Sequence, residues 1–319
     1  AKAQHSEGWS RARSMTVWPL ASSAAPTTTV PTTTVSFAHW NPHYECFLKE
    51  PTCRRNATAS FARLLASGCS PTGCANGGLD FASVIEFEVA DYEPPAGWES
   101  IGLAQTCSHD WATLFYDARR WKLSAWSTGC LAPGRSFAAG AFAPVGGGVA
   151  LTVASAHFPQ TQHNASAYAE ATATLRAVLA RLGAHKPEAA TVLLADTNTE
   201  SPQAAASTAW HNSSGGVNKT NAALLSDLGL WASPDEPPAA PLFKGCCCTP
   251  FFAGDTPFSW EGDRIVANAG SPASSRVLFD PPPVWACSEE LRNATGSEFH
   301  KGVAFDLVLP AARSVSVAS

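Results

Sequence analysis

The sequence predicts an α+β fold built from two mainly antiparallel β-sheets. Short apolar runs of strand character recur along the chain, and only a few segments have helical character. Strands and helices do not alternate regularly, as they do in parallel α/β proteins, so a sandwich of two sheets is the expected architecture. The chain has 319 residues, 45% of them hydrophobic, which is enough for one large domain with extensions.

Both chain ends are expected to lie outside this domain. Residues 1–34 have few periodic apolar positions and contain a repeated Pro-Thr-Thr-Thr-Val sequence. We predict a low-complexity extension there, with an edge strand as the alternative. The folded domain is expected at 35–312, followed by a short tail at 313–319. No charged-then-apolar signal segment opens the sequence, which suggests a mature chain.

The first strands are predicted from alternation and from breaks in it. Residues 35–41 alternate along a half-buried strand until a proline follows Asn41. A short helix is predicted at 56–68, followed by a loop rich in Cys, Gly and Pro. Residues 80–86 then form a buried apolar strand that ends in the carboxylate of Glu86.

The remaining elements are short strands and one crossover helix. Further strands are predicted at 112–116, 136–143, 149–157, 191–195, 263–267 and 303–309. The segment 165–182 is rich in Ala, Leu and Arg, which favours a helix. Because this helix separates two strands, it is expected to cross from one to the other.

The cysteines and glycosylation sequons indicate an oxidising secretory environment. Ten cysteines are many for a cytosolic enzyme, and no spacing gives the paired C-x-x-C pattern of a zinc site, so disulfides are expected. Local bridges are possible for Cys46 with Cys53, Cys69 with Cys74, and Cys107 with Cys130, and later ones among Cys246, Cys247, Cys248 and Cys287, although sequence does not fix the pairing. Asn-x-Ser/Thr sequons begin at Asn56, Asn164, Asn212, Asn218 and Asn293. We therefore predict a secreted or cell-surface glycoprotein.

The charge balance bears on the partners of the protein. The formal net charge is −5 with only 21 Lys and Arg, so there is no excess positive potential to attract a polyanion. A small or weakly charged substrate is favoured over a nucleic acid. No apolar run reaches the 18 residues that a membrane-spanning helix needs. We expect a monomer without a membrane span.

Several predicted strands end in side chains that suit a metal or a proton transfer. These residues are Asn41, Glu86, His157, Asp196 and Asn198. Hard divalent cations such as Mg²⁺, Mn²⁺ or Ca²⁺ prefer carboxylate and amide oxygens to a Cys/His set. The pattern therefore predicts a divalent cation site where these strand ends meet.

The same residues belong to an ordered series of motifs. The series consists of Asn41, Asp80 with Glu86, His157, Ala195-Asp196-Thr197-Asn198, Asp263-Arg264-Ile265 and His300. In this order, from residue 35 to about 309, the sequence resembles the endonuclease/exonuclease/phosphatase superfamily. The resemblance implies a four-layer α/β/β/α sandwich and metal-dependent hydrolysis of a phosphoester.

The resemblance also implies roles for the individual residues. His300 would act as the base that activates water, oriented by Asp263. The metal would be held by Glu86, with Asn41, Asp196 and Asn198 as further ligands. Asp196, His157 and Asn198 would complete the catalytic set, and Arg135, His157 and Asn198 would contact the phosphate, with an exposed surface position as the alternative for Arg135. His39, His43 and His109 are possible extra ligands or phosphate contacts.

Three positions depart from the pattern of the superfamily. Phe299 stands where an Asp usually precedes the last His, Ile85 stands where a Gln often precedes the metal Glu, and Ala195 replaces the usual Gly. Ile85 and Ala195 suit strand interiors. The change at Phe299 affects the final motif, where Glu298 is the nearest acid.

The loop after Glu86 favours a small substrate. Residues 86–93 contain four acids and no base, whereas an enzyme that cuts duplex DNA needs cationic groups beside its cleft. We therefore predict a phosphatase that releases phosphate from small organic phosphoesters, with phosphodiesterase activity possible. A deoxyribonuclease-like endonuclease is the alternative, and a catalytically degenerate binding module or a structural glycoprotein are further ones.

Overall fold

The computed structural model describes most of the predicted domain. The described residues are 32–48, 50–70, 73–74, 78–103, 107, 110–159, 165–186, 189–199, 219–231, 233, 235–240, 262–279 and 300–310.

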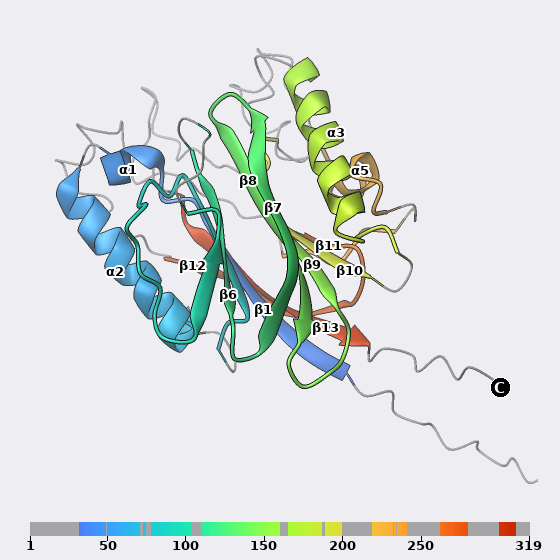
Figure 1. Cartoon of the computed structure of the whole chain (residues 1–319), viewed down its shortest axis with the longest axis horizontal. Helices are drawn as coiled ribbons and strands as arrows, with labels where there is room; N and C mark the ends of the chain where they lie inside the picture. Colours follow the sequence, from blue (N-terminus) through green and yellow to red (C-terminus); the bar gives the residue numbers. More distant parts are fainter. Residues whose placement is uncertain are drawn as a thin grey trace, which may run out of the picture. The chain divides into compact units, whose positions relative to one another are not determined.

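Two β-sheets form the centre of the fold (Figure 1). The first has the strand order β12-β13-β1-β4-β6-β5 and the second the order β11-β10-β9-β8-β7. The strands of the first sheet are β1 (Thr32–Trp40), β4 (Phe81–Ile85), β5 (Trp98–Ile101), β6 (Ala112–Asp117), β12 (Ser271–Leu278) and β13 (Gly302–Pro310). Those of the second are β7 (Trp121–Ala132), β8 (Arg135–Pro144), β9 (Leu151–His157), β10 (Ala190–Asp196) and β11 (Asp263–Ala267).

Each sheet contains one parallel strand pair, and a long helix connects the two strands of each pair. β1 and β4 are joined through α2 (Pro51–Ser67), and β9 and β10 through α3 (Ala165–Arg181). The other pairs in both sheets are antiparallel. Parallel neighbours need such a crossover, whereas antiparallel ones are joined by short turns. The prediction of two mainly antiparallel sheets is confirmed.

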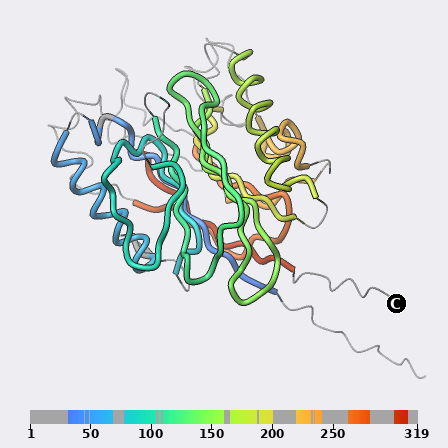
Figure 2. Tube along the Cα trace, viewed as in Figure 1, coloured from blue at the N-terminus to red at the C-terminus, as the bar shows by residue number. Residues whose placement is uncertain are grey.

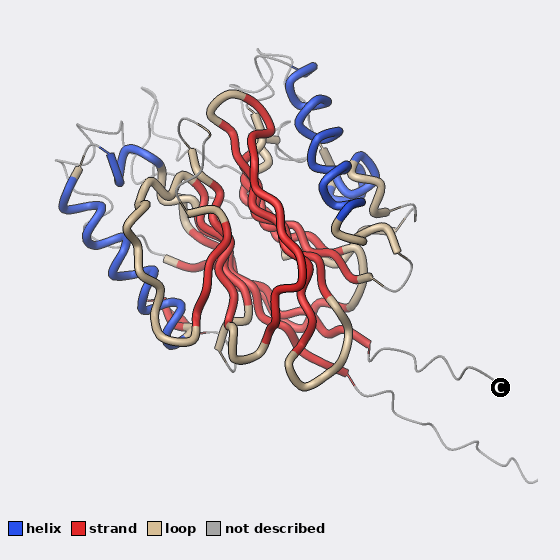
Figure 3. Tube along the Cα trace, viewed as in Figure 1, coloured by secondary structure: helices blue, strands red, loops and turns tan. Residues whose placement is uncertain are grey.

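Three apolar clusters hold four layers together. One cluster packs α2 against the outer face of the first sheet, a second fills the space between the sheets, and a third packs α3 against the outer face of the second sheet. The order of the layers is therefore α/β/β/α, as predicted, and Figure 3 shows the two helices on opposite sides of the strands.

The first and last strands of the domain lie side by side. β1 pairs with β13 from Thr32 opposite Pro310 to His39 opposite Val303. In Figure 2 the blue N-terminal strand accordingly runs beside the red C-terminal one. β1 begins three residues before the predicted start at residue 35, because Thr32–Thr34 pair with β13 through their backbone while their side chains are exposed. Exposed threonines give no alternating apolar signal.

Other elements also differ from the sequence prediction. α2 begins at Pro51 rather than 56, because the Glu50 side chain caps the amide of Thr52 and a proline suits the first helical turn. β5, β7, β12, the short helices α1 (Tyr44–Leu48) and α5 (Asn221–Asp227), and the ribbon of β2 (Cys69–Ser70) and β3 (Gly73–Cys74) were not predicted. β7 is an edge strand with mostly exposed residues in its middle, so it lacks the alternation of a half-buried strand.

Two of the proposed disulfides are present. Cys46 is bonded to Cys53, which links α1 to α2, and Cys107 is bonded to Cys130 on β7. Cys69 and Cys74 lie opposite each other in the β2–β3 ribbon. The cysteines from 246 onward lie outside the described residues, as do all the sequons except Asn56, which lies on α2. Among the described helices, none combines the length and apolarity needed to cross a membrane.

Removal of the Cys107–Cys130 disulfide is expected to destabilise the protein. This bridge closes a loop with a sequence separation of 23, compared with 7 for Cys46–Cys53. Chain-entropy arguments assign about 3 kcal/mol to the longer loop and about 2 kcal/mol to the shorter one. Urea unfolding of the two double Cys→Ser variants measures this difference. An equal or smaller loss for the longer loop would contradict the expectation.

Candidate active site

The site is the polar end of the layer between the two sheets. Along β1, Val35 and Phe37 point into the inter-sheet core, and alternation places His39 and then Asn41 on the same side. The same alternation on β10 leads from the core residue Leu194 to Asp196. The inward-facing residues of β1 and β10 are therefore apolar in the core and polar at the end of each strand. The polar side chains remain buried.

Strand register brings residues distant in the sequence together. Asp196 pairs with His157 on the parallel strand β9 and with Asp263 on the antiparallel strand β11. In the opposite sheet, Asn41 and Glu86 directly follow the parallel strands β1 and β4. The carboxyl ends of both parallel pairs therefore meet at one end of the sandwich.

A cluster of two carboxylates, an amide and an imidazole forms the first part of the site. Asn41 Nδ2 lies 3.2 Å from Glu86 Oε1 and 3.1 Å from Asp196 Oδ2. His157 Nε2 lies 3.8 Å from Glu86 Oε1 and 3.6 Å from Asp196 Oδ2. One ligand atom each from Glu86, His157 and Asp196 lies within 4.8 Å of the others. This is the spacing of atoms that share one bound ion.

The donor set fits a hard divalent cation. Glu86 and Asp196 are buried carboxylates without a Lys or Arg bonded to either of them in the described structure, and two such charges side by side need a compensating cation. The Asn41 amide donates to both carboxylates through Nδ2, while its Oδ1 accepts from His43 N. A rotation of this amide would turn Oδ1 toward a cation held by the carboxylates. Carboxylate and amide oxygens suit Mg²⁺, Mn²⁺ or Ca²⁺.

Backbone strain is concentrated around this cluster. Among the described residues, five that are not glycine have a positive φ, namely His43 (79°), Glu86 (59°), Asp110 (60°), Asn198 (46°) and Phe279 (59°). Glu86 and Asn198 are predicted site residues, and His43 and Asp110 are hydrogen-bonded or electrostatic neighbours of the cluster. Such conformations cost about 1–3 kcal/mol each and persist where the surroundings enforce them. This strain lowers the local stability of the backbone and accompanies the fixed orientation of these side chains.

Two carboxyl groups at the site, those of Asp196 and Asp110, bind protons more tightly than free carboxylates do. Burial and the neighbouring Asp263 raise the pKa of Asp196 to about 6. Burial and the neighbouring Glu86 likewise raise the pKa of Asp110 to about 7. A divalent cation bound by Asp196 must displace its proton, so the affinity for the cation is expected to rise with pH.

The stabilisation by a divalent cation should therefore increase between pH 5 and pH 8. At pH 5 Asp196 is largely protonated in the metal-free protein, and its raised pKa contributes stability that is lost as the pH rises through about 6. A cation that binds only the folded state reverses this loss. Thermal unfolding with EDTA and with saturating Mn²⁺ at both pH values measures the effect. A Tm shift that is independent of pH would contradict it.

The second part of the site is a carboxylate shared by two imidazoles. Asp263 Oδ2 lies 2.8 Å from His300 Nδ1, and Asp263 Oδ1 lies 3.0 Å from His39 Nε2. Burial acts to raise the pKa of Asp263, but His300 and His39 outweigh it and lower the pKa to about 2. Burial acts in the opposite sense on His300, and Asp263 raises its pKa to about 9. Asp263 and His300 are therefore an ion pair in the metal-free protein at neutral pH.

Arg135 lies beside the cluster and is partly neutralised. Its Nη1 donates to Asp110 Oδ2 and lies 2.9 Å from His157 Nε2. Burial and the charge of Arg135 lower the pKa of His157 well below its ordinary value, so His157 is neutral. The predicted phosphate-contacting residues Arg135 and His157 thus lie together at the site.

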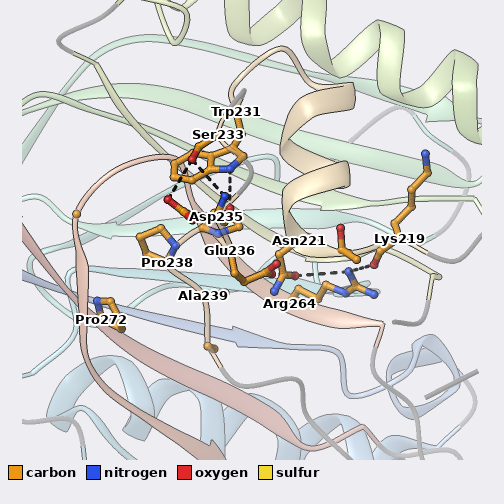
Figure 4. Close-up of a pocket in the computed structure, with 14 residues that line it drawn as sticks. Lys219, Asn221, Trp231, Ser233, Asp235, Glu236, Pro238, Ala239, Arg264 and Pro272 are labelled. Atoms are coloured by element: carbon orange, nitrogen blue, oxygen red, sulfur yellow. Dashed lines mark hydrogen bonds between the residues drawn. The ribbon is translucent and has the colours of Figure 1, made fainter. Parts of the chain in front are cut away.

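Asn198 is held by a tight turn after β10. Its backbone amide donates to Asp196 Oδ1, and its side-chain Nδ2 donates to the carbonyl of Phe158. Arg264 supports this turn from the opposite face of β11, where it donates to the carbonyls of Thr199 and Lys219. Figure 4 shows Arg264 reaching Lys219 at the edge of a hollow of about 730 Å³. None of the predicted catalytic residues lines that hollow, and the described hydrogen bonds of Arg264 hold the turn that carries Asn198.

One residue of the site was not predicted from the sequence, and some predicted residues lie away from the site or outside the described residues. Asp110 was not predicted, because it lies in a loop and no motif marks it; only its pairing with Arg135 reveals it. Asp80 of the motif series lies at the far end of β4, where it accepts from Ser36 N and Trp121 Nε1. His43 lies at the rim, bonded to Asn41. His109, Glu298 and Phe299 lie outside the described residues.

The acidic loop 86–93 presents less unpaired negative charge to a nucleic acid than its sequence suggests. Glu86 points into the site, and Glu88 is buried and accepts from Asp110 N. Asp91 is exposed but paired with Arg54 on α2. Of the four acids, only Glu93 is exposed without a bonded partner in the described structure. The loop therefore argues less strongly against a nucleic acid than predicted.

Comparisons with known proteins identify the fold. No protein-family model and no curated protein matches the sequence. An endonuclease/exonuclease/phosphatase family protein from Bacteroides thetaiotaomicron superposes with a TM-score of 0.58 at 13% identity, over 88% of this chain and 97% of its own. The mannosyl-6-phosphatase of the same species gives 0.53 at 12% identity, over 85% and 98%. TDP2 from D. rerio, complexed with a single-strand DNA product, gives 0.51 at 12% identity, over 86% and 98%. The chain has the fold shared by these proteins.

Proposed function

We propose that this chain, which has the endonuclease/exonuclease/phosphatase fold, is a divalent-metal-dependent phosphoester hydrolase. The observation that carries the proposal is the convergence of Glu86, Asp196 and Asn41 beside the Asp263–His300 pair at one buried end of the sandwich. A structural role needs neither two buried carboxylates that are bonded to no Lys or Arg in the described structure nor the strained backbone at Glu86. Both are expected where a fold is organised around a cation and a reaction.

The role proposed for each residue follows from the atoms that its side chain offers to a cation or to a phosphate group. Glu86, Asp196 and Asn41 would hold the cation, with Asn198 as a further ligand after β10. When bound, a divalent cation polarises a phosphoryl oxygen and neutralises developing charge. Neutral His157 and the Arg135 guanidinium lie together beside the cluster and would contact the non-bridging phosphate oxygens.

His300 would exchange a proton with water or with the leaving group. Its Nδ1 is occupied by Asp263, which leaves Nε2 for the reaction. Negative carboxylates raise the pKa of His300 in the metal-free protein. Charge compensation at Glu86 and Asp196 would lower this pKa toward the range in which an imidazole takes a proton at neutral pH. Asp263 fixes the tautomer in either state.

Small phosphoesters are proposed as the substrates, with a phosphatase as the first candidate. The net charge of −5 supports this choice, since phosphate neutralisation supplies most non-specific affinity for DNA. Arg135 is half-neutralised by Asp110, which suits one phosphate group better than a polyanion. A nuclease is the second candidate, because TDP2 with a DNA product shares the fold and because, of the acids after Glu86, Glu88 is buried and Asp91 is paired with Arg54. We also propose that the protein acts outside the cell, on the support of its two described disulfides.

The test is a matched assay of the purified protein. p-Nitrophenyl phosphate, bis-p-nitrophenyl phosphate and plasmid DNA are incubated with EDTA and after restoration of Mg²⁺, Mn²⁺ or Ca²⁺. Metal-restored cleavage of the monoester with intact plasmid supports the phosphatase. Nicked plasmid makes the protein a nuclease. Absence of turnover with every ion and substrate would overturn the enzyme proposal in favour of a binding module.

A further inference from the structure

A second polar row lies beneath the candidate active site. It consists of His39 on β1, Ser83 on β4 and Ser155 on β9, which are 0%, 1% and 0% exposed. His39 Nδ1 lies 3.1 Å from Ser83 Oγ, and Ser83 Oγ lies 2.7 Å from Ser155 Oγ. The row bridges the two sheets, since β1 and β4 belong to the first and β9 to the second. Apolar side chains would fill this space more simply.

The row ends on the carboxylate that orients His300. His39 Nε2 lies 3.0 Å from Asp263 Oδ1, while Asp263 Oδ2 faces His300 Nδ1. If His39 donates from Nε2, its Nδ1 accepts from the Ser83 hydroxyl, which in turn accepts from Ser155. The side chains of His39, Ser83 and Ser155 then all have hydrogen-bond partners, as buried polar groups require.

We propose that His39 is a positioning residue that fixes the plane of the Asp263 carboxylate and thereby the ring of His300. The inference rests on the proposed function, since it assigns His39 a part in the same reaction. With one oxygen held by His39, the carboxylate has no freedom to rotate away from His300. Residues that orient a metal ligand through a second hydrogen bond change affinity or activity by about 10- to 100-fold when replaced, and we expect an effect of the same size for a residue that orients the partner of His300.

The geometry decides against the other roles considered for His39. A metal ligand or a phosphate contact needs a ring nitrogen that faces the site. Both nitrogens of His39 are occupied, one by Asp263 and one by Ser83. The side chain has no exposed surface, so a substrate cannot reach it. His39 therefore acts through Asp263.

The test compares two substitutions of different hydrogen-bonding ability. His39→Leu fills the space but cannot donate, whereas His39→Gln can place an amide N–H near the position of Nε2. In the hydrolysis assay, the Leu variant is expected to lose about 10- to 100-fold in kcat with an unchanged KM, and the Gln variant to retain most of kcat. His185→Gln is the matched control, because His185 contacts only the Leu228 carbonyl among the described contacts, away from the site.

A second readout does not depend on activity. In ¹⁵N-histidine spectra of the metal-free protein, the Nδ1–H of His300 should be protected and shifted downfield in the wild type and the Gln variant, and lost in the Leu variant. Equal kcat losses for Leu and Gln, or an unchanged His300 resonance in the Leu variant, would overturn the inference. If the wild type hydrolyses no phosphoester, the proposed function fails, and the spectra alone decide whether His39 positions His300.

Discussion

Glu86→Gln is expected to lower metal-dependent hydrolysis by about a thousandfold or more while leaving the fold intact. Glu86 supplies one of the two buried carboxylates that face each other across Asn41. A bound cation contributes several kcal/mol to the transition state, and about 1.4 kcal/mol corresponds to a tenfold change in rate. Glutamine keeps the size of the side chain and one of the two acceptor oxygens, which bind Asn41 Nδ2 and the amide of Tyr44 in the wild type, but it removes the charge.

Calorimetric titration with Mn²⁺ and initial rates measure the two halves of this expectation. Metal affinity and rate should fall together, whereas the unfolding temperature with EDTA should be equal to or above that of the wild type, because one buried charge is lost. Glu93→Gln is the control, since Glu93 is an exposed acid of the same loop. A Gln variant with wild-type rate and Mn²⁺ affinity would remove Glu86 from the metal site.

Residues at strand ends could be predicted from the sequence, because alternation and chain breaks are local signals. Asn41 and Glu86 follow apolar strands directly, and His157 and Asp196 are the last residues of theirs. Their convergence itself is a result of the fold, because the two parallel strand pairs end at the same side of the sandwich. The ordered motifs added the expectation of the four-layer sandwich.

Contacts between distant segments could not be predicted in the same way. His39 was considered as a ligand, yet its bonds to Ser83 and Asp263 depend on the stacking of the two sheets. Asp110 became visible only through Arg135 across a loop. The inward turn of Glu88 is likewise a tertiary effect, because its partner is the backbone of Asp110. A count of charged residues along the loop therefore overestimates the negative charge on its surface.

Asp263→Asn is expected to reduce kcat by about a thousandfold and to change the pH dependence of stability. Replacement of the carboxylate in an Asp–His pair by an amide favours the wrong imidazole tautomer, and losses of this size or larger are typical. The amide also removes the charge that raises the pKa of His300. The catalytic and the electrostatic effects thus have one cause.

The sign of the stability effect follows from the two pKa shifts. His300 has a folded pKa of about 9, so its contribution is complete below its ordinary value of 6.5 and is lost as the pH rises through 9. Asp263 has a folded pKa of about 2, so its contribution is complete above 3.8 and is lost as the pH falls through 2. The ion pair is therefore fully stabilising between about pH 4 and 6.5.

Urea unfolding of the EDTA-treated proteins at pH 6 and pH 9.5 separates the ion pair from simple packing. At pH 6 the Asn variant should be less stable by about 3 kcal/mol, the usual cost of breaking a buried pair. At pH 9.5 the difference should shrink, because the wild type has lost the charge on His300. Asp91→Asn, at an exposed acid paired with Arg54, should change little at either pH. An equal loss at both pH values would mean that Asp263 acts only as a hydrogen-bond acceptor, and the imidazolium assigned to His300 would then be wrong.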